Sequence, residues 1–377
     1  MEVYFDNGAT TKPYDEVVEA AADTMKNNYG NPSSAHGLGL RAEKKLNEAR
    51  DSVARTLGCT RDEIIFTSGG SESNNFLIKG FIGAGDHAVT SAIEHPSVLN
   101  TFKELEKAGV KVTYLEVDDS GRISLEALKA AVNNDTRLVS IMHVNNEVGT
   151  IQDIEDMGNI IKEASPRVKF HVDAVQSYGK YRIDVKKANI DLLSASGHKI
   201  HGPRGIGFAY LRKGLNPKAL ISGGGQERTF RSGTENLPGA VGLSTAAEIM
   251  YKNLETNYRS VRELKEYFIE RLGNIKNIVI NSPCEEYFSP FILSVSFTGV
   301  RGEVLLHLLE EKGIYVSTGS ACSSRERNDS HVLRALGLKT ENLKGTIRFS
   351  FSEYNSRDEV DYTIEVLQKS LKFLRRN

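Results

Sequence analysis

A single lysine on a tight turn is the first candidate for chemistry. Lys199 lies in Ser-Ala-Ser-Gly-His-Lys-Ile-His-Gly-Pro-Arg-Gly-Ile-Gly, residues 194–207, between two short apolar segments that read as strands. The glycines allow a sharp bend and close approach of a ligand, and Ser196 and His198 place polar groups in the same turn. A partly desolvated lysine amine loses its proton readily, so this setting suits a Schiff base. An ordinary surface lysine in a basic loop is the alternative.

A glycine-rich turn supplies a candidate anion site. In Phe-Thr-Ser-Gly-Gly-Ser-Glu-Ser-Asn-Asn, residues 66–75, a predicted strand leads into a helix that opens at Gly70 and Ser71. Free backbone N–H groups and serine hydroxyls at a helix start suit a phosphate. The turn has no Walker-type lysine–serine pair, which argues against a nucleotide P-loop. Read alone, a Gly-Gly turn before a helix is most often an ordinary turn.

Three polar residues follow predicted strands. Asp173 ends an apolar strand, where its carboxylate needs a cation or a donor, either a structural salt bridge or a protonated pyridine nitrogen. His95, in Ile-Glu-His-Pro-Ser, is placed to stack on an aromatic ring and to handle protons, or else it is structural. Asn146 has a similar position and is uninformative by itself.

The C-terminal third offers a thiol and a guanidinium. Cys322 lies among small polar residues with Arg325 and Arg327 nearby, a setting that favours a reactive thiolate over a buried structural cysteine. Arg348 lies on an otherwise apolar predicted strand and suits bidentate capture of a carboxylate, with a core-edge ion pair as the alternative. The other two cysteines, Cys59 and Cys284, have no such setting and are interpreted as structural.

Composition limits the classes of protein. The 377 residues are 39% hydrophobic and 26% charged, which indicates a soluble globular chain long enough for two domains. A net charge of -1 argues against nucleic-acid binding. The odd number of cysteines, three, predicts no disulfide framework or zinc site and favours a reducing cytoplasm. We expect no metal site, no N-terminal leader and no membrane helix, because the nine histidines are scattered and no apolar run approaches about 18 residues.

The elements that must position these residues alternate between strand and helix. The predicted strands are Ile64–Thr67, His87–Ile93, Lys111–Val117, Arg137–Val144, Val168–Asp173, Asp191–Ala195 and Ile206–Leu211. Helices are predicted at Tyr14–Asn27, at a charged segment that follows Gly39 and ends at about Leu57, and at Glu72–Phe81, Ser97–Lys107, Leu125–Val132 and Ile154–Ala164. This alternation predicts an α/β fold with a mostly parallel sheet flanked by helices. Ligands bind at the carboxyl ends of such strands, where most of the candidates lie.

A second, smaller unit follows. Pro238–Gly273 is predicted to be one long connecting helix. Beyond it, strands at Ile278–Ile280, Phe291–Phe297 and Thr346–Phe351 and helices at Glu303–Glu311, Ser330–Leu336 and Ser356–Phe373 predict a small α+β domain. We therefore expect a large domain over residues 1–255, with its N-terminal segment packing against the small domain, and a small domain over 256–377 that carries the Cys322 loop.

A Schiff-base lysine, a strand-end aspartate and a phosphate-binding helix start are together the protein groups that pyridoxal 5'-phosphate requires. The sequence carries several characteristic motifs: the Lys199 loop, Asp-Ala-Val-Gln-Ser, Thr-Ser-Gly-Gly-Ser-Glu-Ser, Gly-Gly-Gly-Gln-Glu-Arg with Arg-Ser-Gly-Thr-Glu-Asn, and Gly-Ser-Ala-Cys-Ser-Ser. From Tyr4 to the C-terminal helix, the chain resembles the NifS/IscS-type cysteine desulfurases, class V aminotransferases of pyridoxal-phosphate fold type I.

The resemblance implies a role for each candidate. Lys199 would hold the cofactor as a Schiff base, Asp173 would pair with the pyridine nitrogen, His95 would stack on the ring, and Gln176 and Asn146 would lie at the phenolic oxygen and the ring. Arg348 would take the substrate carboxylate, with Asn146 beside the substrate. The phosphate would be held by Gly70, Ser71, Ser196, His198 and, across a homodimer, Thr234 of the partner subunit.

The resemblance also implies a reaction. L-Cysteine would become L-alanine, its sulfur would pass to Cys322 as a persulfide, and the persulfide would serve an acceptor such as an iron–sulfur scaffold or a tRNA-thiolation enzyme in the cytoplasm. Ser71 stands where threonine is common and retains the hydroxyl, and Arg204 replaces a frequent lysine. The last predicted helix ends near Asn377, so we expect no longer scaffold-docking tail, which leaves the acceptor open.

Other functions fit parts of the pattern. A selenocysteine lyase could use the same site, whereas an aminotransferase needs no Cys322, and a cysteine lyase would work without persulfide chemistry. A silent homologue acting as an assembly partner would not need Lys199, Asp173 and Cys322 together. A nicotinamide-binding fold is disfavoured because Gly-Pro-Arg-Gly-Ile-Gly, residues 202–207, lacks the dinucleotide spacing.

Overall fold

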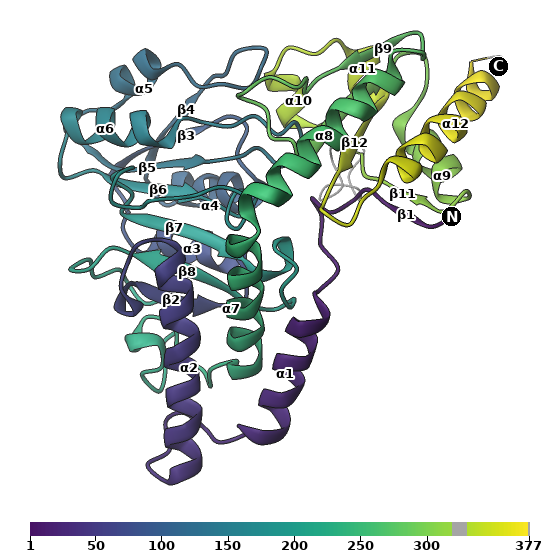
Figure 1. The fold of residues 1–377 in the computed structure, drawn as a ribbon. Helices are drawn as coiled ribbons and strands as arrows, with labels where there is room; N and C mark the ends of the chain where they lie inside the picture. Colours follow the sequence, from purple (N-terminus) through teal and green to yellow (C-terminus); the bar gives the residue numbers. More distant parts are fainter. Residues whose placement is uncertain (319–329, 376–377) are drawn as a thin grey trace.

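The computed structural model describes residues 1–318 and 330–375, and a seven-stranded sheet dominates it (Figure 1). Across this sheet the strands lie in the order β2 (Ile64–Thr67), β8 (Gly207–Leu211), β7 (Leu192–Ser196), β6 (Lys169–Asp173), β5 (Thr136–Met142), β3 (His87–Ser91) and β4 (Lys111–Leu115). Strands β4, β3, β5, β6 and β7 pair in parallel, and β8 alone runs against its neighbours β7 and β2. The predicted α/β fold with a mostly parallel sheet is confirmed.

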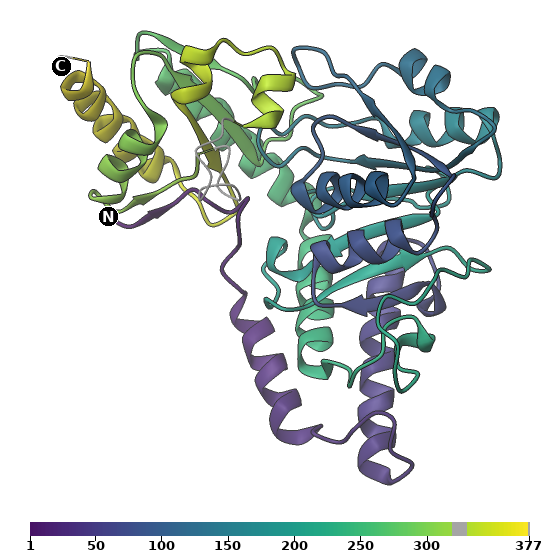
Figure 2. The ribbon, with the colours of Figure 1, turned by 180° about the vertical axis from the view of Figure 1, so that it is seen from behind.

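Helices cover both faces of this sheet because its strands are apolar on both faces. Along β2, Ile65 enters one core while Ile64 and Phe66 enter the other, as the two-residue period of a strand requires. The face of Ile65 is covered by α3 (Gly70–Lys79) and α4 (Pro96–Lys107) (Figure 2). The opposite face is covered by α1 (Asp15–Asn27), α2 (Gly37–Thr56), α5 (Leu125–Ala131), α6 (Ile154–Ala164) and α7 (Leu237–Lys252).

A second hydrophobic core surrounds a three-stranded antiparallel sheet of order β12-β10-β9. Its strands are β9 (Ile278–Ile280), β10 (Ile292–Phe297) and β12 (Thr346–Ser350), and its helices are α8 (Leu254–Leu272), α9 (Gly302–Glu310) and α12 (Arg357–Leu374). Two short helices, α10 (His331–Ala335) and α11 (Thr340–Lys344), precede β12. No helix among the described residues has the length and apolar character needed to cross a membrane.

The N-terminal residues cross from this second core to the large sheet. β1 (Val3–Tyr4) pairs in parallel with β11 (Ile314–Tyr315), and Val3 and Phe5 are buried in the second core. We name residues 5–14 the N-terminal strap. Its Gly8 N–H donates to Ser350 Oγ over 2.7 Å, and its Thr11 N–H donates to the His198 carbonyl over 2.9 Å. The strap therefore contacts both β12 and the turn that carries Lys199.

The segment predicted as one helix over Pro238–Gly273 is two helices, so that prediction is wrong in detail. The first, α7, ends at Lys252, its C-cap Asn253 has a φ of -103° and a ψ of 9° outside helical geometry, and α8 begins at Leu254. The backbone N–H and the side-chain amide of Asn253 both donate to the Ile249 carbonyl. The two helices follow one another from the large sheet to the second core (Figure 1). Gly273 follows α8 directly, as predicted.

A buried ion pair fixes the loop before α7. Glu227 accepts from both terminal nitrogens of Arg50 on α2, over 2.7 and 2.8 Å, and from the Phe66 N–H of β2 over 2.9 Å. Both partners are nearly buried, with side chains 10% and 3% exposed. Loss of Glu227 would therefore leave a buried guanidinium and a backbone donor without their acceptor.

We predict that Glu227→Ala lowers the free energy of unfolding by about 3–5 kcal/mol, because breaking a buried pair from one side strands the other charge. Urea unfolding checks this. Glu266→Ala removes the partner of Arg262 in an exposed pair (N···O 3.0 Å) and should leave the free energy of unfolding nearly unchanged. Equal losses in both variants would contradict the prediction.

A buried histidine on β6 makes stability depend on pH. His171 lies between the Ser140 and Ser194 hydroxyls, at 2.8 and 2.9 Å, and burial lowers its pKa to about 3. As the pH falls, His171 therefore takes up a proton in the unfolded chain at a higher pH than in the folded chain. Its contribution to stability is complete above pH 6.5 and is lost as the pH falls from there toward 3.

We predict that the free energy of unfolding decreases as the pH is lowered from 6.5, and that His171 contributes about 1.4 kcal/mol per pH unit to this decrease. In His171→Asn the slope should be shallower by that amount. At pH 8 His171 is neutral in both the folded and the unfolded chain, so the difference in the free energy of unfolding between the two proteins there isolates the packing change. Parallel pH profiles of the two proteins would contradict the assignment.

Candidate active site

Lys199 ends a single 3-10 turn, η2 (Gly197–Lys199), that follows β7 directly. Its amine Nζ donates to the carbonyls of Gly8 and Ala9 in the N-terminal strap, over 2.7 and 2.8 Å. The amine is thus held in place by backbone acceptors at the carboxyl edge of the sheet. These two carbonyl oxygens orient the amine at this edge.

Asp173 and His95 are joined through two further side chains. Asp173, 4% exposed at the end of β6, accepts from Asn74 Nδ2 of α3 over 2.8 Å and from the Val175 N–H over 3.0 Å. The same Asn74 amide lies 2.9 Å from Ser97 Oγ, and Ser97 Oγ lies 2.8 Å from His95 Nδ1. Because Asn74 donates to it, the Ser97 hydroxyl is free to donate its own proton to His95.

This network determines the tautomer of His95. The Ser97 N–H also donates to Nδ1, over 3.1 Å, so Nδ1 accepts and the proton of the neutral ring is on Nε2. His95 is the N-cap of α4, with Pro96 at the first helical position. Burial lowers the His95 pKa, the nearby Asp173 opposes this, and Lys199 and His331 add to it. His95 is therefore neutral near pH 7.

The glycine-rich turn packs closely against the strands at the start of α3. Gly69 has a φ of 151°, which favours glycine, and a Cβ on Gly70 would lie 2.5 Å from Val175 Cγ2 and 3.7 Å from Ser196 Cβ. Ser71 is exposed in the first turn of this ten-residue helix, where the N–H groups lack intrahelical acceptors. His198 lies on the next turn, with Nδ1 3.2 Å from Thr10 Oγ1, and burial lowers its pKa to about 4.

Gln176 has an unsatisfied atom at the site. Its Nε2 donates to the Gly8 carbonyl over 2.9 Å, the same oxygen that binds Lys199, while its buried Oε1 has no hydrogen-bond partner among the described residues. The glycine-bounded helix start at Gly70, the held amine of Lys199 and this unsatisfied amide fit pyridoxal phosphate. Thr234 is exposed on the loop before α7.

Arg348 lies on β12, in the second core, and points to the same edge. Nη1 donates to the Asn146 carbonyl over 2.7 Å, and Nη2 donates to Asp6 Oδ1 over 2.9 Å. The guanidinium is buried, and within residues 1–318 and 330–375 its Nε has no hydrogen-bond partner. Asn146 thus contacts Arg348 through its backbone. The next residue, Glu147, accepts from the Ser330 hydroxyl, and burial raises its pKa to about 7.

The sequence interpretation missed several residues of the site. Asn74 was not singled out, although it lies four residues after Gly70 and so on the same face of α3. The Asp-Asn-Gly-Ala segment, residues 6–9, was not singled out either. Its small polar composition after a buried Phe5 is the signal that could have identified it.

Cys322, with Arg325 and Arg327, lies outside the described residues. The described residues on either side of them are anchored at the site. Ser317 pairs with Arg348 through backbone hydrogen bonds, and His331 Nε2 donates to the carbonyl of Glu94, the residue before His95.

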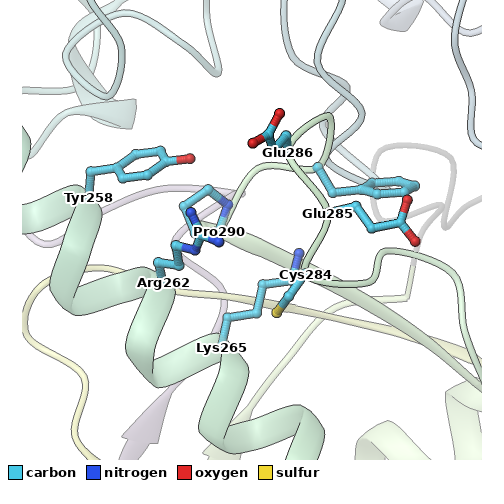
Figure 3. Close-up of a pocket in the computed structure, with 8 residues that line it drawn as sticks. Tyr258, Arg262, Lys265, Cys284, Glu285, Glu286 and Pro290 are labelled. Atoms are coloured by element: carbon cyan, nitrogen blue, oxygen red, sulfur yellow. The ribbon is translucent and has the colours of Figure 1, made fainter.

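A cavity of ≈ 300 Å³ lies away from these groups, between α8 and the loop before β10 (Figure 3). Its Lys265 is 1% exposed and donates to the Pro283 and Ser289 carbonyls over 3.2 and 3.0 Å, so this lysine fastens the loop to α8. Burial lowers its pKa to about 8. Cys284 lines the same cavity, and none of the sequence-predicted site residues does.

Comparisons with known proteins agree with this site. The model of the aminotransferase class-V family matches residues 3–363. The cysteine desulfurase IscS of Methanosarcina thermophila is 46% identical, over 99% of this chain and 93% of that protein. A solved NifS-like protein is 43% identical with a TM-score of 0.93, covering 99% and 100% of the two chains, and SspA in complex with cysteine is 37% identical with a TM-score of 0.83, covering 94% and 100%. The chain therefore belongs to the class V aminotransferase family and, within it, to the pyridoxal-phosphate-dependent cysteine desulfurases of the NifS/IscS type.

Proposed function

We propose that the protein converts L-cysteine to L-alanine and passes the sulfur, as a persulfide on Cys322, to an acceptor. The observation that carries this proposal is the convergence of Lys199, Asp173 and His95 on one sheet edge, with Arg348 brought to it by the N-terminal strap. The similarity to IscS and to SspA, which was solved with cysteine, supports this choice of substrate.

The cofactor would be held by groups that already converge. Lys199 would bind it covalently, Asp173 would hold the ring nitrogen, and His95 would lie on the ring face. Asn146 and Gln176 would lie at the ring and its phenolic oxygen. The phosphate would be bound by the N–H groups and hydroxyls of Gly70, Ser71, Ser196 and His198, with Thr234 of the partner subunit in a homodimer. Bound there, pyridoxal phosphate supplies an electron sink that weakens bonds to the substrate's α- and β-carbons.

The chain's own groups would bind the substrate and move its protons. Arg348 would bind the substrate carboxylate, which places the α-amine toward Lys199. His95, neutral near pH 7 with its proton on Nε2, can give that proton and take one back. Lys199 Nζ, once freed by the substrate amine, is a second proton carrier beside the Gly8 and Ala9 carbonyls.

Cys322 would accept the sulfur. Its thiolate attacks the substrate sulfur, so that a sulfur–sulfur bond forms as the carbon–sulfur bond breaks. The electron pair remains with the carbon, which takes a proton and leaves as alanine. The persulfide then passes to an acceptor, either an iron–sulfur scaffold or a tRNA-thiolation enzyme. A cytoplasmic location would keep Cys322 reduced between turnovers.

We predict that Cys322→Ala lowers alanine release from L-cysteine, without added reductant, by at least about two orders of magnitude. Cys284→Ala, which removes the cavity-lining thiol, is the matched control and should keep wild-type release and a reducible persulfide. Equal release by wild type and Cys322→Ala would show a pyridoxal enzyme that works without this thiol. Release from selenocysteine alone would favour a selenocysteine lyase.

We predict that Arg348→Lys raises KM for L-cysteine about 10- to 100-fold and changes kcat less, because a point charge replaces a planar donor pair. Steady-state kinetics on the folded variant measure both constants. A lowered kcat with unchanged KM would instead assign Arg348 to a step after binding.

A further inference from the structure

The guanidinium proposed to bind the substrate already has a carboxylate partner inside the chain. Arg348 Nη2 lies 2.9 Å from Asp6 Oδ1, with the arginine side chain 5% exposed and the aspartate side chain 22% exposed. Asp6 is the carboxylate paired with Arg348 among the described residues. The positive charge at the carboxylate site is therefore offset before any ligand arrives.

Asp6 does not depend on Arg348 for its position. Its backbone forms a parallel bridge with Ser350, and its carbonyl accepts from the Ala9 N–H over 2.9 Å. The next residue, Asn7, fastens the same strap by donating to the Ser350 carbonyl over 3.0 Å and to Asn355 Oδ1 over 3.2 Å. The strap is thus fixed to β12 by groups that do not touch the guanidinium.

We propose that Asp6 is an internal counter-ion that competes with the substrate carboxylate for Arg348 and so weakens the binding of every monocarboxylate at this site. The proposal rests on the proposed role of Arg348. In this proposal Asp6 sets the affinity of the site for its ligands and takes no part in the reactions of the substrate's amino group or sulfur.

The chemistry of substrate and product makes such a counter-ion useful. Cysteine and alanine carry the same α-carboxylate, so a stronger contact to Arg348 would hold both equally. Uniform binding of this kind lowers KM without raising kcat, and it slows release of the product. The partly exposed Asp6 carboxylate can turn to water when a ligand carboxylate takes its place, which keeps the exchange inexpensive.

Two variants and one matched control test the proposal on the purified holoenzyme. Asp6→Asn keeps the shape and an acceptor oxygen but removes the charge, and Asp6→Ala removes both. The control, Asn7→Ala, loosens the strap without changing the charge at Arg348. Thermal unfolding with and without sodium acetate, against sodium chloride at equal ionic strength, measures carboxylate binding without any turnover.

We expect Asp6→Ala to unfold at a lower temperature than wild type and acetate to restore it, since acetate can occupy the vacated side of Arg348. Wild type and Asn7→Ala should show no acetate effect beyond that of chloride. In steady-state assays, Asp6→Asn should lower both KM for L-cysteine and the inhibition constant of L-alanine by about five- to tenfold.

The outcomes separate this proposal from the proposed function. If Asp6→Asn and Asn7→Ala raise KM alike and acetate restores neither, Asp6 only fastens the strap and the proposal is overturned. If no variant releases alanine but acetate restores Asp6→Ala, the counter-ion role stands and the desulfurase function fails. Alanine release with unchanged constants in Asp6→Asn overturns the counter-ion role alone.

Discussion

Charged groups in the interior at the carboxyl edge of the large sheet each need a partner, because an unpaired buried charge costs several kcal/mol. Asp173 is matched by the Asn74 amide and the Val175 N–H, and Arg348 is matched by Asp6 and a backbone carbonyl. These partners come from a helix start, a strand end and the N-terminal strap. The site is therefore complete only when all three have assembled, which makes its geometry a property of the whole fold.

The strap joins two cores that also meet through the α7–α8 connection and through backbone hydrogen bonds between residues 149–151 and 287–289. It contacts β12 through Gly8 and the Lys199 turn through Thr11, and its carbonyls hold the Lys199 amine. The residue proposed to bind the substrate and the residue proposed to bind the cofactor are thus fixed to one short segment. A displacement of that segment would change both at once, which is a physical reason for its many backbone hydrogen bonds.

Strand ends were the most predictable part of the molecule. Apolar runs bounded by turn residues identified all seven strands of the large sheet, and parallel pairing places Asp173 and Ser196 at one edge. The two-residue strands β1 and β11 carry too little periodicity to be recognised, and the break between α7 and α8 falls at the single residue Asn253. Asp6 and Asn74 escaped prediction because their partners lie far away in sequence, at Arg348 and Asp173.

The roles assigned to Thr234 and Cys322 remain predictions. The role of Thr234 concerns a second subunit, and Cys322 lies outside the described residues.

The pairing of β1 with β11 has a consequence for synthesis on the ribosome. Val3 is synthesised long before its partner Ile314, because most of the sequence lies between them. At ordinary elongation rates this interval is on the order of tens of seconds. Throughout it, Val3 and Phe5 have no core to enter, and the strap has no β12 to bind. The large sheet can form before β12 exists, but Lys199 would then await the carbonyl groups of a docked strap, so the site would mature only after β12 has been made.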